Sequence, residues 1–441
     1  MVTTAPFGSW RSPIGVEDLT AGSTGLAAVA VDGDDLYWLE SRPDQGGRVS
    51  LWRRPFAGGD AEELTPAPTN IRTRVNEYGG GEYGVRDGVV VYSDLADGRL
   101  RRRDADGTVT VLTAEGHVWY GDPEVHPARN LVISVREDHR DAVVAEHGEA
   151  VTTLVAIPLD GSAAHDVDAV TVLAAGADFY STPQLSDDGR LAWTQWNHPN
   201  MPWDSTALHV APLGAGEHGT GGLGAVETVA GGPGESAVQP RWRGADLVFA
   251  SDRTGWWNLY LCSAGEGGTE VRALREVEAE FVEPQWVLGE TPYVVLAGED
   301  EGRLLGLVVT DGFPSLMFLD VTSGELTPAA GLGVGADGLA AGAAGAAAIL
   351  TRPDRPAELA TLGPDGTWTT VRTSTRQAPD PAGVSVPRDV TWPGEGGVVH
   401  GWYYPPLNPD FAAPEGEAPP LFTLSHGGPT SQSRAVFSLA T

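Results

Sequence analysis

A short apolar run near the end of the chain leads into a histidine and two glycines. The run covers residues 421–424 and has the length of a strand. It is followed by a turn of small and polar residues, Ser425-His426-Gly427-Gly428-Pro429. Glycine has no Cβ atom, so its backbone N–H can approach a substrate oxygen closely, as an oxyanion hole requires. The pattern therefore assigns Gly427 and Gly428 to oxyanion stabilisation, although a tight turn after a strand would explain them too.

The same motif indicates a fold. A strand that leads into His-Gly-Gly is how α/β-hydrolases build half of their oxyanion hole, and their nucleophile comes later, in a G-x-S-x-G turn. That pattern is absent from the sequence, and the nearest match, "AGSTG" around Ser23, has Ala21 in place of the first glycine. We therefore expect the hydrolase domain to be incomplete, with its catalytic triad beyond Thr441, and the chain to be inactive alone. His426 and Pro429 are expected to order the loop.

Two further candidates precede a cluster of glycines. Glu77 and Tyr78 stand before three consecutive glycines at 79–81, which permit a close approach of backbone segments. A buried carboxylate at this place could hold the free amino group of a peptide by a charge-assisted hydrogen bond. A turn with structural polar contacts explains the same residues, and we favour that interpretation.

Tryptophans gather in two segments, "WTQWNHPNMPW" and "GWWNLY". They could line a pocket for apolar peptide side chains, although packing between structural units is their commoner use. We keep Trp203, Trp256 and Trp257 as candidates for substrate binding, with Trp193 and Trp196 in the same first segment. The histidines form no HExxH motif and there is no second cysteine for a zinc site. No metal site and no cofactor is therefore predicted.

The elements that must position these residues repeat along the chain. A short strand that begins with leucine and ends in a glycine- or aspartate-containing turn recurs at intervals of 43 to 57 residues, at Leu51, Leu100, Leu154, Leu208, Leu259, Leu316 and Leu359. An offset repeat begins with "DPEVHPARNLVISV", and each copy of it reads as a turn followed by a strand. Several short strands in a unit of this length are the signature of a β-propeller blade.

Seven copies predict an all-β, seven-bladed β-propeller over residues 26–376. Two stacked β-sandwiches are the rival fold, but sandwiches would not repeat at this spacing. The seventh copy lies in an alanine- and glycine-rich stretch, so its alignment is the weakest. Residues 1–25 are expected to pack on the hydrolase domain, whose truncated start covers residues 377–441. Within that start, "RDVTW" and "VVHGWYYPP" alternate as the two strands of a hairpin do.

The composition excludes several classes of protein. The net charge is −32, which opposes binding to nucleic acids and to anionic membranes. All 28 cationic residues are arginine, and without lysine neither P-loop phosphate binding nor Schiff-base catalysis is available. No apolar run is long enough for a transmembrane helix, and no signal peptide is evident. The single cysteine, Cys262, fits a reducing compartment, so we expect a cytoplasmic protein.

Taken together, the propeller and the HGGP motif resemble the prolyl oligopeptidase family of serine peptidases. Segments throughout the chain support the acylaminoacyl-peptidase or dipeptidyl-peptidase-like branch, including "PFGSWRSPI", "RTRVNEYGGGEY", "WNHPNMPWD", "SDRTGWWNLYL" and "HGGPTS". The resemblance implies Ser-His-Asp acyl transfer on short peptides in the full-length parent, with the propeller gating access. A non-catalytic propeller that binds peptides or other partners is the alternative. The sequence leaves open which peptides are cut and the oligomeric state, a homo-oligomer included.

Overall fold

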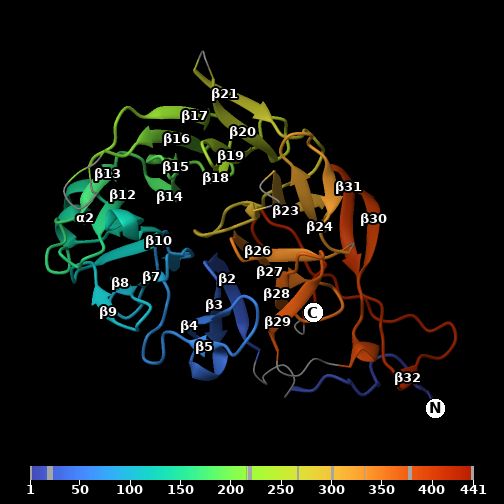
Figure 1. The fold of residues 1–441 in the computed structure, drawn as a ribbon. Helices are drawn as coiled ribbons and strands as arrows, with labels where there is room; N and C mark the ends of the chain where they lie inside the picture. Colours follow the sequence, from blue (N-terminus) through green and yellow to red (C-terminus); the bar gives the residue numbers. More distant parts are fainter. Residues whose placement is uncertain are drawn as a thin grey trace.

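Seven four-stranded sheets dominate the fold. The computed structural model describes residues 2–16, 23–214, 216, 221–265, 268–298, 302–331, 333–375 and 380–438. Each sheet is built from consecutive antiparallel strands. Figure 1 shows that the sheets stand around a common centre in sequence order, which makes them the blades of a propeller. The prediction of a seven-bladed β-propeller is thereby confirmed.

The strands of each blade follow one another from the centre outward. Blade 1 comprises β2 Gly25–Asp32, β3 Asp35–Arg42, β4 Arg48–Pro55 and β5 Glu62–Glu63. Blade 2 comprises β6 Tyr83–Arg86, β7 Val89–Ser93, β8 Leu100–Arg103 and β9 Val109–Val111. Blade 3 comprises β10 Val118–His126, β11 Leu131–Asp138, β12 Val151–Pro158 and β13 Thr171–Ala174. Blade 4 comprises β14 Phe179–Leu185, β15 Arg190–Trp196, β16 Ala207–Pro212 and β17 Glu227–Gly231. Blade 5 comprises β18 Ala237–Arg243, β19 Asp246–Ser251, β20 Asn258–Gly265 and β21 Gly268–Ala273. Blade 6 comprises β22 Tyr293–Val295, β23 Arg303–Thr310, β24 Phe313–Asp320 and β25 Leu326–Pro328. Blade 7 comprises β26 Gly335–Gly342, β27 Gly345–Thr351, β28 Glu358–Leu362 and β29 Trp368–Thr373.

The leucine repeat marks the third strand of every blade. All seven leucines lie on the strands β4, β8, β12, β16, β20, β24 and β28, and each is at most 1% exposed. A third strand has a neighbour on both edges, so an inward leucine is fully enclosed by its own blade and the next one. This holds for Leu359 of the alanine-rich seventh blade as well.

The offset repeat was interpreted differently from what the structure shows. The segment "DPEVH" was read as a turn, but it forms the second half of β10, the innermost strand of blade 3. A β-bulge between Gly121 and Glu124 interrupts the pairing there, and Asp122 adopts a left-handed backbone with φ 55°. Blades 4 and 5 have the same bulge, at Thr182 and Gln239. A bulge accommodates proline because its residues leave the hydrogen-bond ladder.

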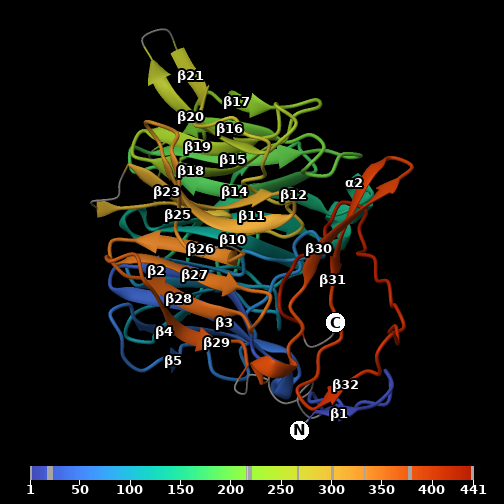
Figure 2. The same cartoon turned by 90° about the vertical axis from the view of Figure 1, so that its right-hand side faces the viewer.

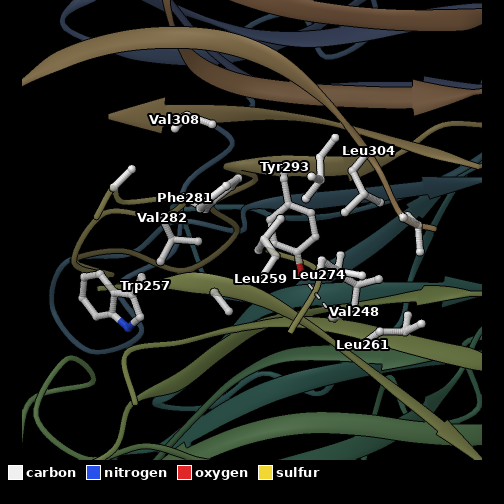
Figure 3. Packing of buried hydrophobic residues seen from close by; sticks show 14 of the residues in the cluster. Val248, Trp257, Leu259, Leu261, Leu274, Phe281, Val282, Tyr293, Leu304 and Val308 are labelled. Carbon is white, nitrogen blue, oxygen red and sulfur yellow. Dashed lines mark hydrogen bonds between the residues drawn. The ribbon is translucent and has the colours of Figure 1, made fainter. Parts of the chain in front are cut away.

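Blades pack against each other through apolar side chains between neighbouring sheets. Figure 3 shows the cluster between blades 5 and 6, where Phe281, Leu259 and Tyr293 are enclosed and the Tyr293 hydroxyl donates to the carbonyl oxygen of Val248 at 3.1 Å. Blade 7 closes the ring against blade 1, with its small side chains, such as Ala347, around the fully buried Trp38. The alanine-rich sequence therefore fits a junction where one partner is bulky.

Two segments that precede innermost strands meet at the centre of the ring. Gly80 leads into blade 2 and forms a parallel bridge with Leu288, which leads into blade 6, and the Leu288 N–H donates to the Gly79 carbonyl at 3.0 Å. These blades are not neighbours in the ring, so the contact crosses its centre. A Cβ atom on Gly289 would lie only 2.6 Å from the backbone of Gly81, which explains why glycine occurs where the two segments cross.

The described segments before and after the propeller lie on one face of the ring (Figure 2). β30 Arg388–Gly394 and β31 Gly397–Tyr403 form the expected hairpin. β1 Thr3–Thr4 pairs in parallel with β32 Phe411–Ala412, so the first residues lie against the C-terminal segment. The short helix α2 Asp141–His147 lies between β11 and β12. Among the residues described, no helix combines the length and apolar character that crossing a bilayer requires.

The predicted strand at residues 421–424 is not formed. These residues have no strand partner, and Leu421, Phe422 and Leu424 are 78%, 86% and 75% exposed. An extended segment becomes a strand only when a neighbouring strand accepts its hydrogen bonds. The described residues of this face offer no such neighbour to this run, so its apolar side chains stay at the surface.

Candidate functional site

A large cavity lies between the propeller and the segment that follows the His-Gly-Gly motif. Its volume is about 1050 Å³. One wall comes from blades 4 to 7 and the segments that connect them, and the other from residues 429–434 together with His400 of β31. This size is at the upper end of the range for small-molecule sites, so the cavity can accept a short peptide.

Four tryptophans form its aromatic wall, namely Trp203, Trp256, Trp257 and Trp286. The rings of Trp203 and Trp286 lie 4.6 Å apart between centroids, and Trp286 also contacts Tyr78 at 5.8 Å. Trp257 is buried, and its indole N–H has no acceptor among the described residues. The structure thus brings together Trp203, Trp256 and Trp257, which the sequence suggested separately. Trp193 and Trp196, by contrast, are buried in blade 4.

Carboxylates give the cavity a negative character. Six of them line it, namely Asp252, Glu280, Glu283, Glu290, Asp311 and Asp337. Burial raises the pKa of Glu290 to about 8, with a further contribution from Glu283. Burial also raises the pKa of Glu280, and the charge of Asp252 adds to this effect. Groups of like charge that are held together without enough counter-charge favour the binding of a cation.

One guanidinium faces this negative charge among the described lining residues. Arg434 forms an ion pair with Asp337 and lies 3.9 Å from a carboxylate oxygen of Glu283. Although burial opposes its charge, the attraction of these carboxylates holds the pKa of Arg434 above its ordinary value. Arg434 is thus engaged with two of the six carboxylates, and the other four are Asp252, Glu280, Glu290 and Asp311.

The predicted oxyanion glycines lie beside this cavity. Gly427 and Gly428 do not line it, whereas Pro429 directly after them does. Gly428 has a φ of 133°, a conformation that residues with a side chain rarely adopt. His426 points its Nδ1 at the carbonyl oxygen of Gly427, at 2.8 Å. Both glycines are exposed, and their role in an oxyanion hole stays a prediction.

Glu77 lies outside the cavity. The buried carboxylate was the alternative that we did not favour, and Glu77 is exposed and does not line the cavity. Its backbone turns left-handed, with φ 63°, as the chain bends toward the centre of the ring, and this directs the side chain outward. Tyr78 is 65% exposed and reaches the site only through its contact with Trp286.

Sequence reasoning missed the segment that contributes most to the site. The run "EFVEPQWVLGE", residues 280–290, supplies Glu280, Glu283, Trp286 and Glu290. None of these four residues was among the site candidates that the sequence suggested. The signal that could have revealed it is the mixture of acidic residues with tryptophan in an interval without strand alternation.

Three residues that could hold a metal ion lie elsewhere on the same face. Ligand atoms of Glu149, Asp178 and His198 lie within 4.8 Å of one another, and this is the one such group among the described ranges. The His198 Nδ1 is 3.2 Å from a carboxylate oxygen of Asp178. The three residues come from separate loops, so no spacing in the sequence predicts that they lie together. The side chains of His198 and Asp178 are 59% and 40% exposed, and the group resembles an ordinary surface ion pair.

Comparison with solved structures shows that the chain is similar to peptidases. No protein-family model and no curated protein matches it. Among solved structures, a puromycin-hydrolyzing peptidase of Mycobacterium tuberculosis is 37% identical over 98% of this chain and 66% of its own, with a TM-score of 0.87. A puromycin hydrolase is 33% identical over 99% of this chain and 67% of its own, with a TM-score of 0.86. A prolyl endopeptidase structure, 13% identical with a TM-score of 0.62, shows the fold alone. The chain thus spans about two thirds of the length of the first two.

Proposed function

Since this chain belongs to the prolyl oligopeptidase family, we propose that it forms the substrate-selecting part of a serine peptidase. The parent enzyme would hydrolyse short peptides and related amides by Ser-His-Asp acyl transfer. Its nucleophile, base and aspartate would lie outside this sequence, in the part by which the relatives are longer. The residues from 377 onward would begin its α/β-hydrolase domain, and we expect the enzyme to work in the cytoplasm.

One observation carries the proposal, namely the acidic and aromatic cavity beside the His-Gly-Gly motif. A peptide with a free amino group offers a cation, and Asp252 and Glu280 offer the matching charges. The first side chain of the peptide would lie on the aromatic wall around Trp203 and Trp286. A cation held by carboxylates beside indole rings gains from both ion pairing and cation–π attraction.

The reacting carbonyl would then lie next to the two glycines. Substrate that is bound through its amino end projects its first amide bonds toward Pro429, which lines the cavity. The backbone N–H groups of Gly427 and Gly428 would receive the negative charge that develops on the carbonyl oxygen. Puromycin has this combination of groups, with a free amino group, an aromatic side chain and an amide bond.

The propeller would also restrict the size of the substrate. The contact between Gly80 and Leu288 crosses the centre of the ring, so a folded protein cannot pass through it. Substrates would instead reach the cavity from the side, between the ring and the C-terminal segment. Short peptides fit such a space, whereas larger chains would clash with the loops around it.

The test uses the longer protein that contains this chain and the part by which the relatives exceed it. We expect labelling by a fluorophosphonate and release of the amino acid from puromycin and from short peptides with a free amino end. Acetylation of that amino end should lower kcat/KM by at least about a hundredfold, since it removes the cation that the carboxylates bind.

Two outcomes would contradict the proposal. Absence of labelling, with peptides bound but not cleaved, would favour the non-catalytic propeller. Equal turnover of free and acetylated peptides would mean that the carboxylates of the cavity do not select an amino group.

A further inference from the structure

Three contacts tie the segment after the two glycines to the propeller. The Trp286 indole N–H donates to the carbonyl oxygen of Thr430 at 3.0 Å. The side-chain amide of Gln432 donates to Glu283 at 2.6 Å, and Arg434 forms its ion pair with Asp337. Every second residue from 430 to 434 is therefore attached either to the segment that precedes blade 6 or to β26 of blade 7, as one side of an extended segment would be.

Building on the proposed peptidase function, we propose that Trp286, Glu283 and Asp337 are positioning residues for the oxyanion loop. They would hold residues 430–434 so that the backbone of Gly427 and Gly428 points its N–H groups at the reacting carbonyl. The propeller would then take part in the geometry of the reaction, in addition to selecting its substrates.

The connection between the anchor and the glycines is short and stiff. Only Pro429, whose φ is restricted by its ring, separates Gly428 from Thr430. The turn is tight, since a Cβ atom on Gly428 would lie 2.9 Å from the Thr430 nitrogen. Few dihedral angles are thus free between the anchored carbonyl and the glycine N–H groups, and a displacement of Thr430 would move them directly.

Trp286 also belongs to the substrate cavity. Its ring contacts Trp203 at 4.6 Å on the aromatic wall, while its N–H holds Thr430. A substrate that packs on this wall therefore touches the residue that restrains the oxyanion loop. Binding energy from the first side chain can in this way appear in kcat and not only in KM. The three anchors would link the choice of substrate to the rate of acylation.

Stability alone does not explain these contacts. Arg434 and Asp337 are 35% and 36% exposed, and ion pairs at such exposure contribute little to folding. Variants at these positions should therefore fold, which makes their effect on the reaction measurable.

The central test is Trp286→Phe in the longer protein, because phenylalanine keeps an aromatic ring and removes the donor. We expect kcat to fall about tenfold, since small misplacements of catalytic groups are costly, and KM to change less than about threefold. Fluorophosphonate labelling should slow in proportion to kcat. The matched control is Trp368→Phe, because the Trp368 N–H also donates to a backbone carbonyl, that of Ala329, at 2.8 Å but away from this segment.

A charge exchange provides an independent variant. Asp337→Arg should lower kcat, and the double variant Asp337→Arg with Arg434→Asp should restore most of it, because the pair is rebuilt in reverse. Urea unfolding of the single and double variants is measured beside kcat, and a loss of kcat without a matching loss of stability separates positioning from folding. Arg355→Met, which breaks an exposed ion pair with Asp354, controls for the loss of a surface guanidinium.

The outcomes separate this inference from the function on which it rests. If the unchanged protein is not labelled and cleaves nothing, the peptidase proposal fails, and this inference with it. If the protein is active and Trp286→Phe keeps kcat within about twofold, or Trp368→Phe loses as much, only the positioning role is overturned. A tenfold loss confined to Trp286→Phe and a recovery by charge exchange would support it.

Discussion

The propeller buries its apolar strand residues, whereas the C-terminal segment leaves them exposed. In the propeller, leucines of seven successive blades are at most 1% exposed, because each sheet packs against the next. In the C-terminal segment, the strand residues Trp392 and Val398 are 48% and 66% exposed, and Phe422 reaches 86%. Both regions are rich in apolar residues with strand-like patterns. What differs is whether a neighbouring sheet covers them.

This difference shows that a sequence pattern specifies a strand only together with its partner. A repeat supplies the partner automatically, since each unit is covered by the next copy of itself. The segment around residue 421 belongs to no repeat, and the described part of the chain provides no adjacent strand for it. Its attachment to the propeller depends instead on a few polar contacts of residues 430–437.

The largest contrast should appear when one phenylalanine is truncated in each region. Phe249→Ala removes a fully buried ring of β19 and should lower the free energy of unfolding by about 3–5 kcal/mol. Phe422→Ala removes an exposed ring and should change it by less than about 0.5 kcal/mol. Urea unfolding of the 441-residue chain, followed by tryptophan fluorescence, measures both. A loss of more than about 2 kcal/mol in Phe422→Ala would mean that this segment is packed in solution.

The crossing at the centre of the ring can be tested with glycine. Gly289→Ala should destabilise the chain by about 3 kcal/mol, because φ is 71° and the new Cβ would lie 2.6 Å from the backbone of Gly81. The control is Gly33→Ala, with φ 54° and no atom within 4 Å of the new Cβ, where about 1 kcal/mol is expected from the backbone conformation alone. Equal losses in the two variants would show that the two segments do not cross as described.

These features differ in how far the sequence could predict them. The propeller was predictable because every repeat places a buried leucine at the same position of its blade. Even Leu359 in an alanine-rich stretch falls on the expected strand. Trp203, Trp256 and Trp257 were predictable as residue types but not as neighbours, since their meeting depends on how blades 4 and 5 are placed. The composition of the segment from 280 to 290 could have marked it as a candidate, but its position was not predictable, because its course toward the centre follows from the crossing with Gly80.

The raised pKa of Glu290, a half-buried carboxylate of the cavity, predicts a dependence of stability on pH. The pKa of Glu290 is raised to about 8 from an ordinary value of 4.5, so the folded chain retains a proton that the unfolded chain releases. The contribution of Glu290 to the free energy of unfolding is therefore most favourable below pH 4.5 and is lost as pH rises to about 8. We expect Glu290→Gln to gain about 2 kcal/mol relative to the unchanged chain between pH 5 and pH 9.

The measurement for this variant is urea unfolding at several pH values within that range. Glu415→Gln, which changes an exposed glutamate, controls for the loss of one negative charge. If the two variants run parallel from pH 5 to pH 9, Glu290 is not a buried proton carrier. The cavity would then be open enough to hydrate its carboxylates.

The smallest effect is expected where the two regions join. A double-mutant cycle with Arg434→Met and Asp337→Asn in the 441-residue chain should give a coupling free energy of about 0.5 kcal/mol, because both side chains are more than a third exposed. Calorimetric or urea unfolding of the four proteins measures it. A coupling above about 2 kcal/mol would make the junction part of the folded core. A small coupling free energy together with a large loss of kcat in the longer protein would instead mean that the ion pair orients the loop without stabilising the fold. Orienting a loop requires little free energy when the alternative positions are close in energy.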